Sequence, residues 1–418
     1  MREMKDSGIE WVGEIPETWD VHPVYVYFSE RKNKNYALQE QNLLSLSYGK
    51  IIRKDIDTVG GLLPASFNTY NIVEAGDIII RPTDLQNDKR SLRTGLVTEK
   101  GIITSAYIDL APKDNINSAY FHYLLHSYDV QKVFYNMGNG VRQGLNYSEF
   151  SKLMVFAPSR DEQDSIVDYL NDKCAEIDAL SDDIQSEIDT LEAYKRSVIT
   201  EAVTKGLDKT VPMKDSGIEW VGEIPATWDI KKGKYCLRYV QKPTKPDDDV
   251  ITCFRDGEVT LRKNRREDGF TISLKEIGYQ GIDVGDLIVH GMDGFAGAIG
   301  ISDSRGKASP VLNVLDTDNN KRYIMYYLRS LAFNGVFLAL STGIRVRTCD
   351  TNWGKLRELL YVLPPKKEQD DIVRFIDDRL TATDEIIAQK QEQLAVLADY
   401  KKSMIYEYVT GKKEVPVA

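Results

Sequence analysis

The chain has 418 residues, of which 42% are hydrophobic, and a chain of this length folds as two or three domains rather than around one core. It carries 54 Lys and Arg residues against 64 Asp and Glu residues, which gives a formal net charge of −10. Spread evenly, that charge would exclude a nucleic-acid-binding protein, because phosphate contacts need clustered positive charge. No apolar run approaches the roughly 20 residues that cross a bilayer, and no apolar leader opens the chain, so a cytoplasmic protein is expected.

Motifs of catalysis and metal binding are missing from the sequence. The four cysteines form no CxxC pair and the four histidines form no HExxH motif, which predicts a reduced protein with no metal site. There is no GxxxxGK[ST] nucleotide loop and no acidic-Pro-Pro-aromatic signature of an amino-methyltransferase. We therefore expect a chain that is not an enzyme, with no catalytic residues and no cofactor of its own.

An internal repeat organises the chain. Residues 4–20 read MKDSGIEWVGEIPETWD, residues 213–229 read MKDSGIEWVGEIPATWD, and 16 of the 17 positions agree. A weaker repeat follows in each half, PSRDEQDSIVDYLNDK at 158–173 and PPKKEQDDIVRFIDDR at 364–379. The chain is thus expected to contain two halves, in which shared segments surround inserts whose sequences look little alike.

Six segments follow from this repeat. They are a conserved repeat segment at 1–20, an insert at 21–157, a conserved helical region at 158–212, a second repeat segment at 213–229, a second insert at 230–363 and a second helical region at 364–418. Within the inserts, 76–82 and 285–290 read as a turn followed by a buried strand, and 118–136 and 320–340 read as helices. The fold class is therefore predicted to be α+β, with a globular domain in each insert.

Two long helices are predicted, at 161–204 and 367–410, because apolar residues recur in heptads in both stretches. The first stretch also contains no Pro or Gly. The expected seam, the line of apolar residues between the helices, contains Leu170, Ile177, Ile184, Leu191 and Val198 in the first helix and Ile376, Leu380, Ile387, Leu394, Leu397 and Met404 in the second. Flanking positions hold Ile166, Leu180, Ile188 and Tyr194. We expect an antiparallel coiled coil with an internal pseudo-two-fold duplication, and the alternative is two independent surface helices.

The net charge is distributed unevenly. Residues 21–157 contain 15 basic and 13 acidic residues, residues 230–363 contain 21 and 16, and residues 158–212 contain 6 and 14. The inserts are therefore basic, and their basic clusters with nearby amide and hydroxyl groups suit phosphate contact and base readout. The candidate DNA-binding residues are Thr83, Gln86, Asn87, Lys89, Arg90, Arg93, Arg142, Arg262, Lys263, Arg265, Arg266, Arg345 and Arg347.

The paired MKDSGIEWVGEIPxTWD segments, the EQ helix starts and the two inserts resemble the specificity subunit of type I restriction–modification systems. The resemblance implies that each insert is a target recognition domain that reads one half of a bipartite, asymmetric site in double-stranded DNA. It also implies that the coiled coil sets the spacer and docks two methyltransferase (modification) subunits. S-adenosylmethionine, ATP and magnesium would belong to those subunits and to restriction/translocase subunits, which would carry out DNA methylation and cleavage in host defence.

Two other functions remain open from the residues alone. One is a coiled-coil scaffolding protein whose inserts bind proteins and read no DNA, and the other is a methyltransferase with a degenerate motif. Trp11, Trp19, Trp220 and Trp228 of the repeat segments either pack in the core or dock a partner.

Overall fold

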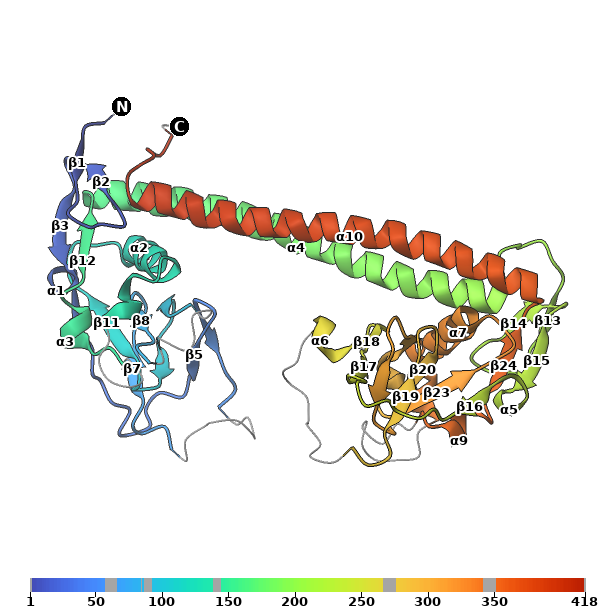
Figure 1. Ribbon diagram of the computed structural model, residues 1–418. Coiled ribbons are helices and arrows are strands. Elements are labelled where there is room, and N and C mark those ends of the chain that lie inside the picture. The colour runs from blue at the N-terminus through green and yellow to red at the C-terminus, as the bar shows by residue number, and fades with distance from the viewer. Residues whose placement is uncertain are drawn as a thin grey trace. The chain divides into compact units, whose positions relative to one another are not determined.

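A computed structural model of the chain describes residues 2–56, 66–83, 85, 92–137, 144–265, 276–340 and 351–416. The chain divides into two compact units, unit 1 (Met1–Ile184 and Glu392–Ala418) and unit 2 (Gln185–Gln391). The two long helices, α4 (Arg160–Lys205) and α10 (Lys366–Val409), each contribute residues to both units (Figure 1). None of the described helices is both long and apolar enough to cross a membrane.

Unit 1 is built around a four-stranded antiparallel sheet in the order β4-β11-β8-β9. Four two-stranded pairings accompany it, β1 with β2, β3 with β12, β5 with β6 and β7 with β10. The elements before α4 are β1 (Met4–Asp6), β2 (Glu14–Pro16), β3 (Asp20–Pro23), α1 (Val24–Tyr27), β4 (Phe28–Glu30), β5 (Leu44–Ser47), β6 (Lys50–Arg53), β7 (Asn71–Val73), β8 (Ile78–Ile80), β9 (Thr94–Leu96), β10 (Gly101–Ile103), β11 (Ile108–Pro112), α2 (Ser118–Val130), η1 (Val133–Asn136), α3 (Tyr147–Phe150) and β12 (Met154–Ala157).

Unit 2 repeats this topology strand for strand, with a central sheet in the order β16-β23-β20-β21 and pairings β13–β14, β15–β24, β17–β18 and β19–β22. Its elements are β13 (Met213–Asp215), β14 (Glu223–Pro225), β15 (Asp229–Lys232), α5 (Gly233–Cys236), β16 (Arg238–Val240), β17 (Ile251–Cys253), β18 (Val259–Leu261), α6 (Arg262–Arg265), β19 (Gln280–Ile282), β20 (Leu287–His290), η2 (Gly294–Ala296), β21 (Ile299–Ile301), β22 (Gly306–Ala308), β23 (Leu312–Asp316), α7 (Lys321–Phe333), α8 (Val336–Ala339), α9 (Trp353–Leu356) and β24 (Leu360–Leu363). The α+β fold class is confirmed, and the two inserts share one fold despite their dissimilar sequences.

The helices expected within the inserts are shorter than the apolar patterns suggest. In unit 1, α2 ends at Val130, and Lys132 then adopts a positive φ of 60° before the 3-10 turn η1. In unit 2, Gly335 has a φ of 69° and separates α7 from α8. The expectation of one helix over 118–136 and another over 320–340 was therefore wrong at the C-terminal ends, because a left-handed residue interrupts the hydrogen-bond ladder.

The long helices run antiparallel in each unit. In unit 1 the rings of Tyr169 and Tyr408 lie 4.6 Å apart and Lys401 pairs with Asp178 at 2.6 Å. In unit 2, Lys195 pairs with Asp384 at 2.5 Å, and Lys390 pairs with Glu187. Residue numbers rise along α4 as they fall along α10, so the alternative of two independent surface helices was wrong.

The seam between the helices is apolar at most heptad positions. Leu170, Ile177, Ile184, Val198, Ile376, Ile387 and Met404 are buried, and Leu191, Leu380, Leu394 and Leu397 are half-buried. Leu180 and Tyr194 were expected to flank the seam but are 48% and 45% exposed. The other two expected flanking residues, Ile166 and Ile188, are buried. Cys174, which was not expected there, is also buried, because it lies four residues after Leu170 and therefore on the same helix face.

Two ion pairs at the edge of the seam are equivalent under the sequence repeat. Lys195 and Lys401 stand at matching positions of the LEAYKRS and LADYKKS stretches, and Asp384 and Asp178 also match. The Lys390–Glu187 pair has no such counterpart, because Ile184 and Gln393 stand at the matching positions.

A buried glutamine at the start of each long helix fastens that helix to its recognition fold. The side chain of Gln369 donates to the carbonyl of Pro364 at 2.8 Å and accepts from the backbone N–H of Asn320, the N-cap of α7, at 2.9 Å. Gln163 makes the same two contacts in unit 1, with Pro158 and with Asn117, the N-cap of α2. The repeated EQ dipeptide is thus structural in both units.

The tryptophans of the repeat segments differ in exposure. Trp19 and Trp228 are buried, and their indole N–H groups donate to Glu162 at 3.2 Å and to Glu368 at 3.0 Å. Trp11 packs edge-on against the ring of Tyr128 at 4.3 Å. Trp220, its counterpart in unit 2, is 39% exposed. Core packing therefore accounts for Trp19 and Trp228, while the docking interpretation stays open for Trp220.

Replacing Gln369 by alanine should destabilise unit 2 by about 2 kcal/mol, because the buried carbonyl of Pro364 and the half-buried N–H of Asn320 lose their partners. The exposed Gln393→Ala substitution on the same helix should stay within about 0.5 kcal/mol of the parent chain. Urea denaturation followed by circular dichroism measures both changes. Equal stabilities for the two variants would show that the glutamine is not an anchor.

A buried carboxyl group in the central sheet of unit 1, that of Asp109, has an abnormal pKa. Arg31 donates to the buried carboxylate of Asp77 at 2.8 and 3.0 Å. Asp109 is also buried, and this burial, together with the negative charge of Asp77, raises the pKa of Asp109 to about 8. Val314 stands at the equivalent register position in unit 2. The protonated carboxyl is therefore peculiar to unit 1.

Asp109→Asn should stabilise unit 1 at pH 7.5 and have little effect at pH 4. The folded-state pKa of Asp109 is about 8, whereas the unfolded chain ionises this group near pH 4. The folded state therefore binds one more proton between these pH values, and the parent chain loses up to about 1.4 kcal/mol of stability per pH unit as the pH rises. Urea denaturation at both pH values measures the difference, with the exposed Asp114→Asn as control. A stabilisation that does not change with pH would contradict the assignment.

Candidate nucleic-acid interface

A short hairpin in each unit presents polar side chains beyond the central sheet. In unit 1, β5 and β6 are joined by a tight turn in which Tyr48 and Gly49 have φ values of 45° and 79°. Tyr48 is 82% exposed and Lys50 is also exposed. A bulky residue held in the left-handed region at a hairpin tip is uncommon. Neither residue was predicted from the sequence, because Tyr-Gly is not one of the Asn-Gly, Asp-Gly or Gly-Gly pairs that signal a two-residue hairpin turn.

The equivalent hairpin of unit 2, β17–β18, leads directly into the basic helix α6. Lys263 pairs with Asp249 at 2.5 Å. Arg265 pairs with Asp256 at 2.6 Å and with Glu258 at 3.0 Å. The hydrogen bond to Asp256, together with the charge of that carboxylate, raises the pKa of Arg265. Carboxylates of the same chain thus hold these exposed cations in place, and a DNA phosphate would have to replace them.

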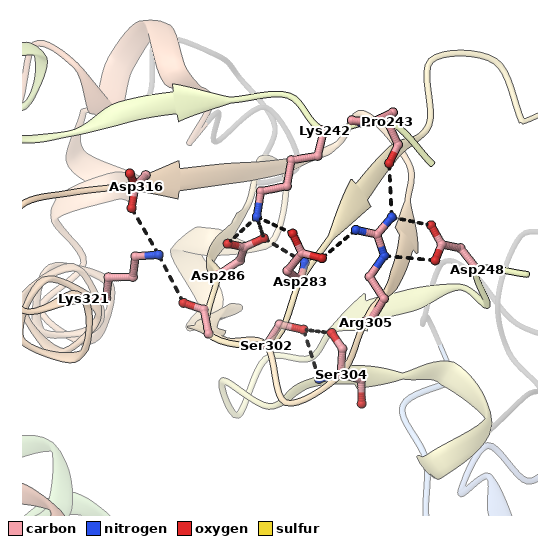
Figure 2. Close-up of polar contacts among 11 residues, drawn as sticks. Lys242, Pro243, Asp248, Asp283, Asp286, Ser302, Ser304, Arg305, Asp316 and Lys321 are labelled. Carbon is pink, nitrogen blue, oxygen red and sulfur yellow. Dashed lines mark hydrogen bonds and ion pairs between the residues drawn. The ribbon is translucent and has the colours of Figure 1, made fainter. Parts of the chain in front are cut away.

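An ionic network joins the segment that follows β16 to the turn before β20 (Figure 2). Lys242 lies 2.7 Å from Asp286 and 2.8 Å from Asp283. Arg305 pairs with Asp283 at 2.6 Å and with Asp248 at 2.8 Å. Hydrogen bonds from Lys242 and Arg305 lower the pKa of Asp283 to about 2. Asp248 precedes the partner of Lys263, so the network fixes the backbone that positions α6.

The network starts from a turn that both units share. In unit 2 the carboxylate of Asp286 accepts from the backbone N–H of Asp283 at 2.8 Å, just before β20. In unit 1 the carboxylate of Asp77 accepts from the backbone N–H of Glu74 at 2.8 Å, just before β8. A basic residue that follows the edge strand, Lys242 or Arg31, pairs with this aspartate in each unit. The aspartates of the Gly-Asp turns expected from the sequence therefore also form ion pairs that fix the end of the edge strand to the turn.

The candidate DNA-binding residues are placed unequally. Lys263, Arg265 and Thr83 are exposed, and Arg262 is half-buried with its Nε 3.3 Å from the hydroxyl of Thr252. Arg93 is buried, so its expected contact with DNA is not supported by its position. The other candidates, Gln86, Asn87, Lys89, Arg90, Arg142, Arg266, Arg345 and Arg347, lie outside the described residues.

The guanidinium of Arg93 has a structural role in unit 1. It donates to the hydroxyl of Tyr135 at 3.0 Å and to the carbonyl of Thr83, while the backbone N–H of Arg93 donates to Asp129. Its positive charge is therefore used within the fold, and charge clustering in the sequence could not distinguish this buried arginine from exposed ones.

Nothing in the described part of the chain suggests a metal centre. There, no three His, Cys, Asp or Glu side chains come together in a group that could hold a metal ion. Cys174, Cys236 and Cys253 are buried free thiols. The arrangement can bind polar and anionic surfaces through α6 and the hairpin tips, and the described residues present no nucleophile–base pair there.

The fold is similar to those of solved structures. A chain from a study of the complex assembly and conformational transition of a type I R-M system matches with a TM-score of 0.66 at 12% identity, covering 96% of this chain and 99% of that chain. The HsdS subunit from Thermoanaerobacter tengcongensis matches with a TM-score of 0.47 at 12% identity (96% and 98% covered), and the S subunit of a type I restriction–modification system from M. genitalium with 0.36 at 11% identity (93% and 96% covered). The first match shows a shared fold over nearly the whole chain. No family model and no curated protein sequence matches.

Replacing both Lys263 and Arg265 by glutamine should weaken binding to duplex DNA and flatten its salt dependence. Each lost phosphate contact lowers the slope of log K against log salt by about 0.9, so the double variant should lose about 1.8. Arg374→Gln on α10 removes a cation that is more exposed than either of these, and as the control it should leave the slope unchanged. Fluorescence anisotropy at several salt concentrations measures the slopes. Parallel slopes for the parent chain and the double variant would place the interface elsewhere.

Proposed function

We propose that the chain is the DNA specificity subunit of a type I restriction–modification complex. One observation carries the proposal: two inserts with dissimilar sequences adopt one topology and are held by nearly identical repeat segments and long antiparallel helices. A protein that reads two unlike DNA half-sites with the same machinery needs this combination. The TM-score of 0.66 to a chain of a type I R-M system supports it.

In this proposal the inserts at 21–157 and 230–363 are target recognition domains, and each reads one half of a bipartite site. Their dissimilar surfaces, an exposed tyrosine at the β5–β6 tip and a basic helix after β18, support unlike half-sites and an asymmetric target. The cations of α6 contact phosphates, and the amide and hydroxyl groups nearby are available for base readout.

The proposed partners follow from the repeats. Two nearly identical repeat segments suit two copies of one partner, a methyltransferase subunit, and the partly exposed Trp220 is a docking candidate on the second copy. The chain itself is not an enzyme in this proposal. Adenine methylation with S-adenosylmethionine, and ATP- and magnesium-dependent translocation and cleavage, belong to the modification and restriction/translocase subunits in the cytoplasm.

Exchanging residues 21–157 for the insert of another specificity subunit should change one half-site and leave the other intact. The reason is that the hydrophobic core of each unit is separate. The hydrogen bond from Gln163 to the carbonyl of Pro158 lies just outside the insert and is retained in the exchange. Sequencing that detects methylated adenines in DNA exposed to the assembled complex reads both half-sites. If both half-sites changed together, the modular arrangement would be refuted, and an absence of any DNA-dependent methylation would favour the scaffolding function.

Lengthening both helices by one heptad, near Ile184 in α4 and near Leu394 in α10, should lengthen the spacer between the half-sites. Seven residues add about 10.5 Å of helix, which corresponds to about three base pairs. The heptad keeps the seam in register, whereas a four-residue insertion in both helices rotates it and serves as the control. The same methylation mapping measures the spacer, and an unchanged spacer in the heptad variant would show that the helices do not set it.

A further inference from the structure

A polar groove of about 480 Å³ lies within unit 2, between the long helices and the recognition fold. Its walls come from α4, from α7, from the β17–β18 turn and from residues of α10. The basic side chains that line it are Lys195, Arg196, Arg255 and Arg329. A cavity of this volume is the size that small molecules occupy in proteins.

Two of these arginines share one aromatic ring. The guanidinium carbon of Arg196 lies 5.7 Å from the ring centroid of Phe333, and that of Arg329 lies 5.4 Å from the same centroid. Cation–π contacts of this kind hold guanidinium groups in place while leaving their N–H donors available. The two arginines are therefore positioned before any ligand arrives.

The donors of these arginines are incompletely used. Arg329 donates from Nη2 to the carbonyl of Asp256 at 2.6 Å, but its buried Nε has no acceptor among the described residues. A buried donor without a partner costs about 1–3 kcal/mol, so an acceptor that reaches it binds favourably. Arg196 is exposed and forms no ion pair with a described carboxylate.

The carboxylates of the groove are already engaged by other cations. Glu192 and Asp384 both pair with Lys195, at 3.4 and 2.5 Å. Asp256 pairs with Arg265 of α6 at 2.6 Å. The acidic groups therefore do not neutralise Arg196, and the groove keeps a site for an anion.

Unit 1 contains a groove of about 310 Å³ at the equivalent place, between α2 and α10. There Lys402 stands at the position of Arg196 in unit 2. Lys402 is neutralised by Asp399, which lies 2.8 Å away. Unit 2 has Ala193 at the position of Asp399, so Arg196 has no such partner there. His126 replaces Arg329, and desolvation lowers the pKa of His126 to about 4, so that it is neutral at pH 7. The two grooves share a location and differ in charge.

We propose that the groove of unit 2 binds a phosphate group through Arg196 and Arg329, and that the equivalent groove of unit 1 does not. Guanidinium forks donate to phosphate oxygens in pairs, and two forks fixed on one ring suit a group with several equivalent oxygens. The phosphate belongs either to a free phosphorylated compound or to the backbone of bound DNA. The second source rests on the proposed function, and the first does not.

Isothermal titration calorimetry, with inorganic pyrophosphate added to the full chain, tests the site. We expect binding by the parent chain, at least a tenfold weaker association for Arg196→Gln, and no change for Lys402→Gln, the matched variant in the groove of unit 1. Arg196 is exposed, so its substitution preserves the fold, which thermal unfolding verifies. Absence of binding to the parent chain, or equal losses in the two variants, would overturn the proposal.

DNA binding by the assembled complex separates the two sources. If a DNA phosphate occupies the groove, Arg196→Gln lowers the slope of log K against log salt by about 0.9 and Lys402→Gln does not. If the slope is unchanged while pyrophosphate binding is lost, the ligand is a free phosphorylated compound and the DNA source is overturned. A parent complex that binds no DNA refutes the proposed function, and the pyrophosphate titration alone then decides whether the groove is a phosphate site.

Discussion

The burial of two shared helices is the constraint on which the structure depends. α4 and α10 each supply residues to both units, so the core of either unit is incomplete without a segment of each helix. In unit 1 the hydroxyl of Tyr120 donates to the carbonyl of Val409 near the end of α10. In unit 2 the hydroxyl of Tyr323 donates to the carbonyl of Val203 near the end of α4. Each fold therefore stabilises, and is stabilised by, the ends of both helices.

Lys and Arg side chains at several surfaces of this acidic chain form ion pairs with its own Asp and Glu residues. The cations of α6 pair with Asp249, Asp256 and Glu258, and the pairs at the helix seam use Asp178 and Asp384. Exposed pairs of this kind contribute little to stability, because water screens them. These ion pairs instead hold long, flexible Lys and Arg side chains in fixed positions near where an anionic partner would bind. When such a partner binds, its anionic group replaces the carboxylate of the chain.

Duplication has allowed the two units to diverge in chemistry while keeping one architecture. The same turn before the central strand is fastened by Arg31 in unit 1 and by Lys242 in unit 2. A protonated Asp109 in one sheet corresponds to Val314 in the other. In the groove of unit 1 Asp399 pairs with Lys402, whereas in unit 2 Ala193 stands at that position and Arg196 has no ion pair with a described carboxylate. Such differences are tolerated because the backbone framework is set by the repeated anchors rather than by these side chains.

The sequence by itself determined the duplication, the positions of both long helices to within about one residue, and the α+β class, because periodicity and near-identical segments are local signals. It did not reveal that the dissimilar inserts share a topology, since strand pairing joins residues far apart in the chain and many side-chain patterns satisfy one backbone. Nor could it separate the buried Arg93 from the exposed Arg265, or find the two arginines that meet on Phe333. Burial and pairing of charge are properties of the folded neighbourhood, and only the tertiary structure decided them.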